Sequence, residues 1–416
     1  MSAGAPANPI ETAAPRGAAV FFIFITILLD TLALGVIIPV LPKLVESFVN
    51  NDTAHAARML GLFGTAWAVM QFFFSPILGA LSDRFGRRPV VLVSNFGLSL
   101  DYVLLALAPS LSWLFVGRVI SGITSASIPT AFAYIADITA PEKRAEVFGK
   151  MGVAFGAGFI LGPALGGAVG DIDPRLPFWV AAGLSFANTL YGWLILPESL
   201  PPERRSPLRW RSANPVGALH LLRSDRVLAG LSITNFLAQL AHVVLPSTFV
   251  LYATYRYGWD IKTVGLTLAM VGSCAMAVQG AAIGPIVERF GERRALFFGL
   301  GCGAAGFLIF GAAPDGPLFW LGVPVMALWG IAGAAAQALA TQLVTPEQQG
   351  QLQGATSSVA SLSQLLGPFL FTLTFAYFIS AEAPFELPGA PFLLASALLL
   401  LALAVSVRTL ALARIR

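Results

Sequence analysis

Charged residues, cysteine and histidine are scarce in this sequence. Only 11% of its 416 residues are Asp, Glu, Lys or Arg, and it contains two cysteines and three histidines. Cys274 and Cys302 lie far apart in apolar stretches, which indicates neither a disulfide framework nor a metal site. His55, His220 and His242 are scattered, and no Gly-x-Ser-x-Gly nucleophile motif is present. We therefore expect no metal, no cofactor and no enzymatic activity.

Apolar residues dominate the rest of the chain. Hydrophobic residues make up 56% of it and the mean hydropathy is +0.78, which is more than the core of a soluble protein can bury. A helix needs about 20 apolar residues to cross a bilayer. The sequence therefore predicts an all-α membrane protein with twelve transmembrane helices, at residues 18–39, 60–81, 89–108, 111–136, 151–169, 177–196, 227–251, 263–287, 295–313, 317–341, 352–379 and 391–407.

Lysines and arginines are unevenly distributed between alternate loops. Of the 25 in the chain, 19 fall on one face. By the positive-inside rule that face is cytoplasmic, which predicts a bacterial inner membrane protein with both termini in the cytoplasm. The formal charge of +4 then belongs to these loops and does not indicate nucleic-acid binding. The loop residues on the other face are Lys43, Arg58, Arg175, Arg256 and Lys262.

An internal repeat relates the two halves of the chain. The segment Gly79–Gly86 ends in Asp-Arg-Phe-Gly, and Gly284–Gly291 ends in Glu-Arg-Phe-Gly. This repetition predicts two pseudo-symmetric six-helix bundles, an arrangement in which substrate binds near the membrane midplane between the halves. Other matches at the same offset pair Pro141-Glu142 with Pro346-Glu347, and Gly162-Pro163 with Gly367-Pro368.

The longest charged stretch separates the sixth and seventh spans and is the natural linker between the halves. We therefore predict an N-terminal bundle at residues 17–196, a cytoplasmic linker at 197–226 and a C-terminal bundle at 227–416. Residues 1–16, which are rich in Ala and Pro, are predicted to be a disordered lead.

Three charged residues lie well inside the predicted spans: Asp30, Asp101 and Arg118. An unpaired charge at membrane depth costs at least about 2.5 to 3.5 kcal/mol, so such residues usually pair, face water or handle ions. Asp101 and Arg118 have similar depths in two spans joined by a short turn at Pro109, so they can face each other. Asp30 lies near the midplane, where a carboxylate can be reached from both sides in turn. We predict that all three act in proton coupling, with a purely structural tie as the alternative for the Asp101–Arg118 pair.

The loop between spans two and three reads Gly79-Ala-Leu-Ser-Asp-Arg-Phe-Gly-Arg-Arg-Pro89. Its two glycines permit close helix approach and a tight turn, and its aspartate and arginines can pair and cap helix ends. The loop resembles the signature motif of the major facilitator superfamily. The resemblance implies a twelve-helix transporter fold and a cytoplasmic gate made of Gly79, Asp83, Arg84, Gly86, Arg87 and Arg88, with Asp137 at the inner end of span four.

Span five carries small residues at helical spacing and ends in Gly-Pro-x-x-Gly-Gly. Small residues let helices approach closely, and a proline frees backbone carbonyls. The segment resembles the antiporter motif of the same superfamily, which implies export rather than uptake. Its residues are Gly158, Gly162, Pro163, Gly166 and Gly167.

The resemblance narrows to the tetracycline/proton antiporters through Leu29-Asp30-Thr31, Leu100-Asp101-Tyr102 and Gly117-Arg118. It implies roles in proton coupling or substrate handling for the three charged residues, and places Gln71 in the substrate pathway. One position departs from the pattern, because those exporters carry an aspartate in span nine where this chain has Gly303. The resemblance thus implies a tetracycline-like exporter with the same fold and coupling, and leaves open whether tetracycline itself is the substrate.

The polar groups of the second half are neutral. With many Phe and Trp residues nearby, they predict a mostly apolar pocket with a few orienting hydrogen bonds. Gln239 and Gln337 are the amides we expect to bind substrate, and His242 is a further candidate, although its apolar neighbours make a buried core histidine about as plausible. The amides of this half are Asn235, Gln239, Gln279, Gln337 and Gln364.

The favoured hypothesis is a proton-coupled antiporter that exports a small lipophilic drug or metabolite by alternating access. Its expected partners are the small-molecule substrate, protons and the lipid bilayer, and it is expected to act as a monomer. Two alternatives remain open, a proton symporter for uptake of a small solute such as a sugar and a ligand-sensing membrane receptor. A channel is disfavoured because no span presents a ring of like charge.

Overall fold

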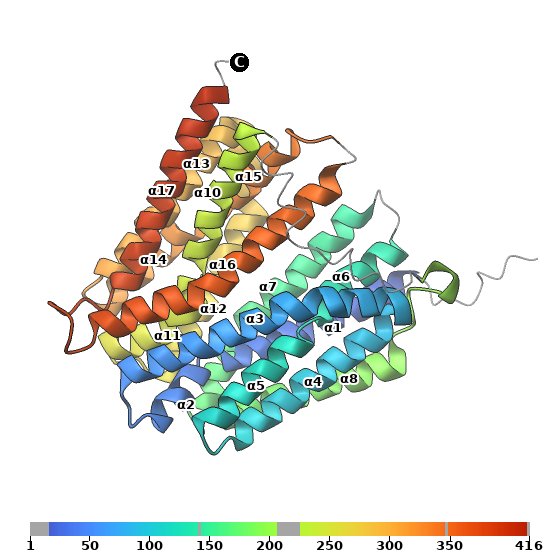
Figure 1. The fold of residues 1–416 in the computed structure, drawn as a ribbon, viewed down its shortest axis with the longest axis horizontal. Coiled ribbons are helices and arrows are strands. Elements are labelled where there is room, and N and C mark those ends of the chain that lie inside the picture. Colours follow the sequence, from blue (N-terminus) through green and yellow to red (C-terminus); the bar gives the residue numbers. More distant parts are fainter. Residues whose placement is uncertain (1–15, 140–142, 206–224, 346–347, 414–416) are drawn as a thin grey trace, which may run out of the picture.

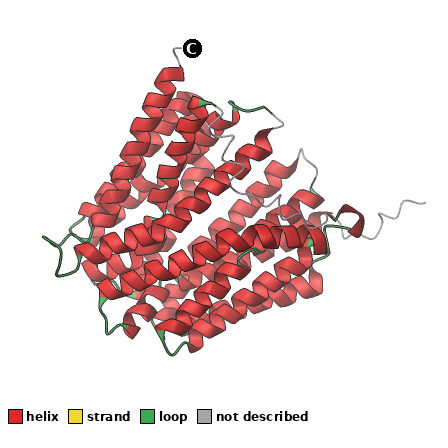
Figure 2. Cartoon of the chain, viewed as in Figure 1, coloured by secondary structure: helices red, strands yellow, loops and turns green. Residues whose placement is uncertain are grey.

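The computed structural model describes the chain apart from residues 1–15, 140–142, 206–224, 346–347 and 414–416. Its described residues form helices joined by turns, with no strand among them (Figure 2). Nearly all of the predicted lead and most of the predicted linker lie outside these residues. The same is true of the repeat pairs Pro141-Glu142 and Pro346-Glu347.

The N-terminal helices form one bundle, coloured blue to green in Figure 1. Within it, α1 packs against α7 and α8, α4 packs against α8 and α5, and α3 packs against α5. A short 3₁₀ turn at Pro202–Arg204 follows the bundle. The helices are α1 (Arg16–Ile37), α2 (Leu41–Phe48), α3 (Thr53–Phe85), α4 (Arg87–Leu107), α5 (Leu111–Thr124), α6 (Ser127–Ile138), α7 (Arg144–Gly170) and α8 (Leu176–Ile195).

The C-terminal helices form a second bundle, coloured yellow-green to red in Figure 1. Here α10 packs against α17 and α16, and α13 packs against α17, α15 and α14. The elements are α10 (Arg226–His242), α11 (Val244–Tyr257), α12 (Ile261–Ala277), the π-helical turn η5 (Val278–Ala282), α13 (Ile283–Ala312), α14 (Gly316–Ala327), α15 (Gly330–Thr341), α16 (Gln349–Phe378) and α17 (Ala390–Ala413).

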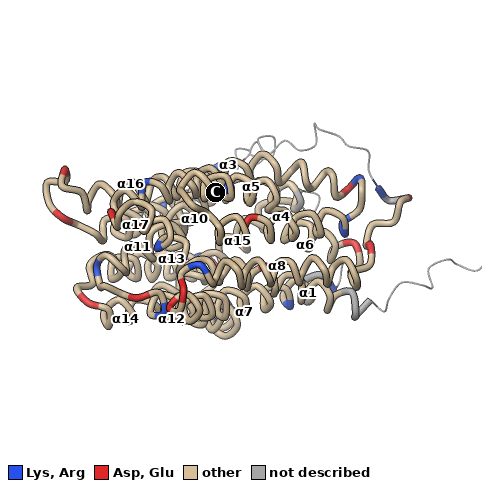
Figure 3. Tube along the Cα trace, turned by 90° about the horizontal axis from the view of Figure 1, so that it is seen from below, with Lys and Arg blue, Asp and Glu red and all other residues tan. Residues whose placement is uncertain are grey.

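Eleven continuous helical stretches in the described part of the chain are long and apolar enough to cross a membrane. One of them, Ile261–Ala312, has 52 residues, and at 1.5 Å per residue it would measure about 78 Å if straight. That is more than twice the roughly 30 Å hydrocarbon core. The chain turns within this stretch at Gly291, so the stretch holds two spans and the twelve predicted spans are accounted for. Charged residues gather mainly at helix ends and in loops (Figure 3).

Three of the predicted spans are interrupted, whereas the sequence predicted continuous helices, and a fourth break at the end of the first span precedes the short helix α2. The breaks follow α1, separate α5 from α6, fall at Val243 between α10 and α11, and fall between α14 and α15. At three of these breaks a proline lies in the first turn of the next helix. Proline is tolerated there because the backbone N–H groups of the first turn have no acceptor within the helix. These prolines are Pro42, Pro129 and Pro246.

The repeat is visible in the backbone. Gly86 and Gly291 occupy equivalent positions, and both have positive φ, 109° and 76°, with ψ near 159°. This region of backbone space is nearly restricted to glycine. Each glycine therefore reverses the chain at the same end of the molecule, which we call the basic end because Arg84, Arg87, Arg88, Arg289, Arg293 and Arg294 gather there.

The two turn glycines allow a matched test. Gly86→Ala and Gly291→Ala should both lower stability by about 1–3 kcal/mol through backbone strain. A Cβ at Gly86 would also collide with the Glu198 carboxylate, whereas one at Gly291 would meet nothing within 4 Å. We expect the larger fall in thermal unfolding midpoint for Gly86→Ala; equal falls would show that the Glu198 contact adds nothing.

The two bundles contact each other mainly along two helix pairs, α7 with α12 and α3 with α16, the second of which crosses the centre of Figure 1. The helix α11 adds smaller contacts with α3 and α2. Towards the end opposite the basic end, Gly167 lies against Gly265, and Gly64 lies against Pro368. Towards the basic end the glycines of α7 and of the facing segment have open space where a Cβ would lie. The bundles therefore meet at one end and separate at the other. The open positions are Gly149, Gly152, Gly280 and Gly284.

Candidate functional site

Asp30 on α1 is a buried carboxylate, with 6% of its surface exposed. The Asn188 side-chain amide on α8 donates to its Oδ1 at 2.8 Å. Asn95 on α4 lies on its other side, and with its amide turned so that both ends are satisfied it donates to Asp30 at 3.1 Å. Both asparagines are fully buried. The carboxylate is thus held by neutral donors, and no counter-charge is among its hydrogen-bond partners in the described residues.

The break in span four supplies further polar groups to this region. Ser127 begins α6 and its hydroxyl is another hydrogen-bond partner of the Asp30 carboxyl. Two residues earlier, the Ser125 hydroxyl accepts a hydrogen bond from Gln71 Nε2 of α3 at 3.2 Å. The interruption between α5 and α6 therefore directs two serines into the N-terminal bundle. Gln71, predicted to lie in a substrate pathway, is placed in this polar region.

Asp101 of α4 and Arg118 of α5 form an ion pair, with 2.6 Å between Oδ2 and Nη2. The aspartate side chain is fully buried and 12% of the arginine side chain is exposed. The pairing inferred from the short turn at Pro109 is confirmed. A single N–O contact holds the pair, and Asp101 Oδ1 and Arg118 Nε are buried without a hydrogen-bond partner.

At the basic end, Arg87 joins three elements. Its guanidinium contacts Asp83 of α3 and donates through Nε to Asp137 of α6 at 2.9 Å. The Ser199 hydroxyl also donates to Asp137, at 3.3 Å. The inter-helix ion pairs predicted from the loop motif are therefore present. Arg88 donates to the Trp193 carbonyl of α8.

Glu198 belongs to the same cluster and sequence reasoning missed it. Its carboxylate accepts from the backbone N–H groups of Arg87 at 2.9 Å and Arg88 at 3.3 Å. These are unpaired donors of the first turn of α4, and a negative charge there is favoured by the helix dipole. The signal available in the sequence was an acidic residue directly after the sixth span.

Two members of the loop motif take no part in this cluster. Arg84 is exposed and its guanidinium lies 5.2 Å from the ring centroid of Phe85. A Cβ at Gly79 would meet nothing within 4 Å, so the predicted close helix approach at Gly79 is wrong for this structure. The reason is that the bundles are apart at the basic end.

One face of α7 packs closely on α1. Gly158 lies against Thr31, Gly162 against Gly35, and Gly166 against the backbone of Val36 at the end of α1. A neighbouring face carries Gly167, which packs on α12. The glycines of the predicted motif, around Pro163, thus place α7 between α1 and the second bundle.

This packing predicts opposite effects for two alanine substitutions in α7. At Gly166 a Cβ would collide with the Val36 carbonyl, which is backbone and cannot turn away, so Gly166→Ala should destabilise by about 1–3 kcal/mol. At Gly152 there is open space, so Gly152→Ala should stabilise by up to about 1 kcal/mol through helix propensity. Thermal unfolding midpoints of both variants check this. A fall at Gly152 matching that at Gly166 would refute the packing argument.

A cavity of about 270 Å³ lies inside the C-terminal bundle, between α10, α12, α13 and α15. Gln239 and His242, both predicted as substrate contacts, line it together with Asn235 and Gln279. His242 is exposed to this space, so it is no buried core histidine. The remaining wall is mostly aliphatic, with Trp329 as its large aromatic residue. The neutral, largely apolar pocket predicted for this half is present.

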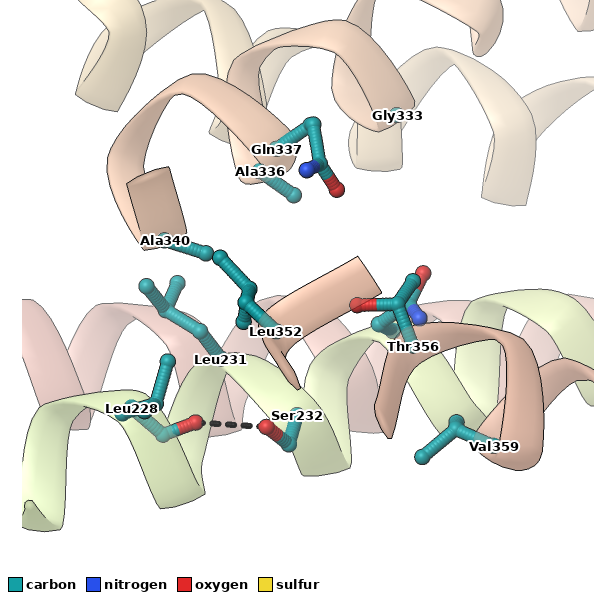
Figure 4. A pocket seen from close by; sticks show the side chains of 11 residues that line it. Leu228, Leu231, Ser232, Gly333, Ala336, Gln337, Ala340, Leu352, Thr356 and Val359 are labelled. Atoms are coloured by element: carbon teal, nitrogen blue, oxygen red, sulfur yellow. Dashed lines mark hydrogen bonds between the residues drawn. The ribbon is translucent and has the colours of Figure 1, made fainter. Parts of the chain in front are cut away.

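Gln337 lines a smaller cavity of about 30 Å³ between α10, α15 and α16 (Figure 4), which adjoins the larger one at Asn235, Gly333 and Ala336. In Figure 4 its amide projects between the helices, with Thr356 and Ser232 on neighbouring elements. Its Nε2 is buried without a hydrogen-bond partner. The space has room for about one water. Gln337 is not among the residues that line the larger cavity.

Gly303 of α13 is the position where the resemblance predicted the loss of an aspartate. A Cβ there would lie 2.7 Å from Cγ of Trp329 and 2.8 Å from a methyl group of Leu399. The indole therefore fills the room that a side chain at this position would need. The indole is held between Phe307 and His242, with ring centroids 5.7 and 5.6 Å away.

Asn95, Asn188 and Ser127 were not among the predicted site residues. A signal for them existed, because an amide inside an apolar span needs a partner. Sequence alone does not show which way each side chain faces. In the described residues no group of three or more His, Cys, Asp or Glu side chains is placed to hold a metal ion.

The chain matches the family model of the Major Facilitator Superfamily over residues 23–368 and 282–414. It is 39% identical to the class C tetracycline resistance protein of Escherichia coli, over 84% of this chain and 88% of that protein. It is 34% identical to the class B protein of Escherichia coli, over 84% of this chain and 86% of that protein.

Solved structures show the same architecture. The human organic anion transporter MFSD10 superposes with a TM-score of 0.69 at 26% identity, covering 95% of this chain and 100% of that chain. The nucleoside transporter NupG superposes with a TM-score of 0.76 at 12% identity, covering 94% of this chain and 99% of that chain. The second likeness concerns the fold alone.

Proposed function

Because this chain belongs to the Major Facilitator Superfamily, we propose that it is a proton-coupled antiporter that exports a small lipophilic drug or metabolite by alternating access. It is a multi-pass membrane protein. The relatives named as tetracycline resistance proteins support export of a drug-like compound. The observation that carries the proposal is the buried Asp30 carboxylate, held by neutral amides at membrane depth in a chain of this family.

Asp30 is the proposed proton carrier. Without a cationic partner, a buried carboxylate binds a proton readily and releases it when its surroundings become wet. Asn188 and Asn95 hold the carboxyl oxygens in place in both forms, because an amide can donate to a carboxylate and accept from a carboxylic acid. The Asp101–Arg118 pair is proposed as a second element of the coupling.

The conformation supports alternating access. The bundles meet at one end through α7–α12 and α3–α16 and are apart at the basic end. If the basic end is cytoplasmic, as the positive-inside rule indicates, the structure is open to the inside. In the closed-inside state the loop cluster at Arg87, Asp83 and Asp137 would meet the second bundle. Both termini are then cytoplasmic. We also propose that the membrane is the bacterial inner membrane and that one chain is the functional unit.

The bundles are proposed to comprise residues 17–196 and 227–416, joined by the linker at 197–226. Export rather than symport is supported by the resemblance of the α7 glycine motif, which includes Gly166 and Gly167, to the antiporter motif of the superfamily. It is also supported by the neutral lining of the C-terminal cavity.

Reconstitution tests the proposal. The purified protein is placed in liposomes that contain a pH-sensitive dye, and a tetracycline, a lipophilic cation and a neutral amphiphile are added in turn. A dye response that requires one of these compounds supports proton-coupled transport. Silence with every compound, from protein that is folded in the liposomes, would favour the receptor alternative.

A further inference from the structure

We propose that the cavity between α10, α12, α13 and α15 binds an uncharged, planar aromatic molecule of one or two rings that carries hydrogen-bonding groups. The inference rests on the proposed transport function, because it names the class of substrate. Its basis is the charge, the polar groups, the ring contacts and the size of this one cavity.

The charge of the lining excludes an ionic ligand. Among the described residues, no Asp, Glu, Lys or Arg lines the cavity, and His242 is the one titratable residue in its lining. An ion brought to this depth without an opposite charge would lose at least about 2.5 to 3.5 kcal/mol. A neutral molecule avoids that cost, so the cavity selects against charged compounds of the same shape.

The polar groups of the lining are available to a ligand. Asn235 and Gln239 on α10 and Gln279 in η5 each carry a donor and an acceptor, and all three face the cavity. Within the described residues, no hydrogen bond joins any of these side chains to another protein group. A buried ligand with an amide or hydroxyl group could therefore pair with them without breaking an existing contact.

The aromatic groups of the lining favour a planar ligand. His242 and Trp329 lie with their ring centroids 5.6 Å apart, and Phe307 supports the indole from behind. Gly303 allows the indole to sit close against α13. A rigid aromatic wall of this kind stacks on flat rings at an offset or edge-on.

The size of the cavity limits the ligand. Its volume of about 270 Å³ falls just below the roughly 300–1,000 Å³ typical of pockets for drug-sized molecules. One or two fused rings therefore fit, whereas a four-ring compound would need the cavity to widen.

The absence of charge on the substrate affects the driving force for transport, because exchange of an uncharged molecule for a proton moves net charge across the membrane. Transport would then be driven by the membrane potential, at about 2.3 kcal/mol per charge for each 100 mV.

Equilibrium binding to the full-length protein in lipid nanodiscs tests the inference with three probes of matched shape: neutral naphthamide, anionic naphthoate and cationic N-methylquinolinium. We expect naphthamide to bind at least about tenfold more tightly than either ion, which corresponds to about 1.4 kcal/mol. Naphthoate or N-methylquinolinium binding as tightly as naphthamide would overturn it, and so would the absence of naphthamide binding.

Variants locate the binding. Gln239→Leu should weaken naphthamide binding by about three- to tenfold through a lost hydrogen bond, and Trp329→Leu should weaken it through lost stacking. Trp193→Leu, an exposed tryptophan of α8, is the matched control and should have no effect. Unchanged affinity in both cavity variants would refute the site. Naphthamide binding is measured at equilibrium without a proton gradient, so a failure of proton coupling and a failure of this cavity give different results.

Discussion

Asp30→Asn is expected to reduce substrate-driven proton flux to the level of protein-free liposomes. Asparagine has the shape of aspartate but binds no proton in this pH range. Its amide would face the donors of Asn188 and Asn95, so we expect a loss of stability of about 1–2 kcal/mol from mismatched hydrogen bonds and a folded protein. The measurement is the dye response in reconstituted liposomes, together with the thermal unfolding midpoint.

Asp171→Asn is the matched control, because that carboxylate is exposed at the end of α7. It should keep full proton flux. If Asp30→Asn retained proton-coupled transport at the wild-type rate, Asp30 would not be the proton carrier and the proposed mechanism would be wrong.

Arg118→Leu is expected to be the most destabilising single change in the N-terminal bundle. It leaves Asp101, which is fully buried, without its counter-charge, and breaking a buried ion pair from one side costs about 3–5 kcal/mol. The fall in thermal unfolding midpoint of the purified protein measures this. A fall no greater than that of an exposed arginine such as Arg84→Leu would contradict the prediction.

The double variant Asp101→Leu/Arg118→Leu separates structure from coupling. Replacing both members of a buried ion pair with apolar residues is often neutral or stabilising, so the unfolding midpoint should recover. If the pair takes part in proton coupling, the double variant stays inactive although it is stable. Recovery of transport along with stability would show that the pair only ties α4 to α5.

Features that depend on residues close together in the sequence could be predicted from it. The spans follow from apolar length, and the Asp101–Arg118 pair follows from equal depth on two helices joined at Pro109. The positive φ of Gly86 and Gly291 agrees with the repeat that relates them. In each case a short connection or a local backbone requirement fixes the geometry.

Features that depend on helix rotation could not be predicted. Asn95 and Asn188 reach Asp30 from two different helices, and only the packing of α4 and α8 against α1 shows which way they face. The break before Ser127 was also missed, because the apolar stretches on either side of the polar Thr124–Ser127 segment together predict one continuous span. Gln239 lines the larger cavity and Gln337 the smaller one beside it, and only the packed helices show which way each amide faces.

The most direct test of proton-coupled export is accumulation against a gradient. The protein is reconstituted inside out, a proton gradient is imposed, and the internal concentration of a compound that elicits the dye response is followed. Proton-coupled export predicts that the compound rises above its external concentration and returns to equality when an ionophore collapses the gradient. Equilibration without accumulation, unaffected by the ionophore, would contradict it.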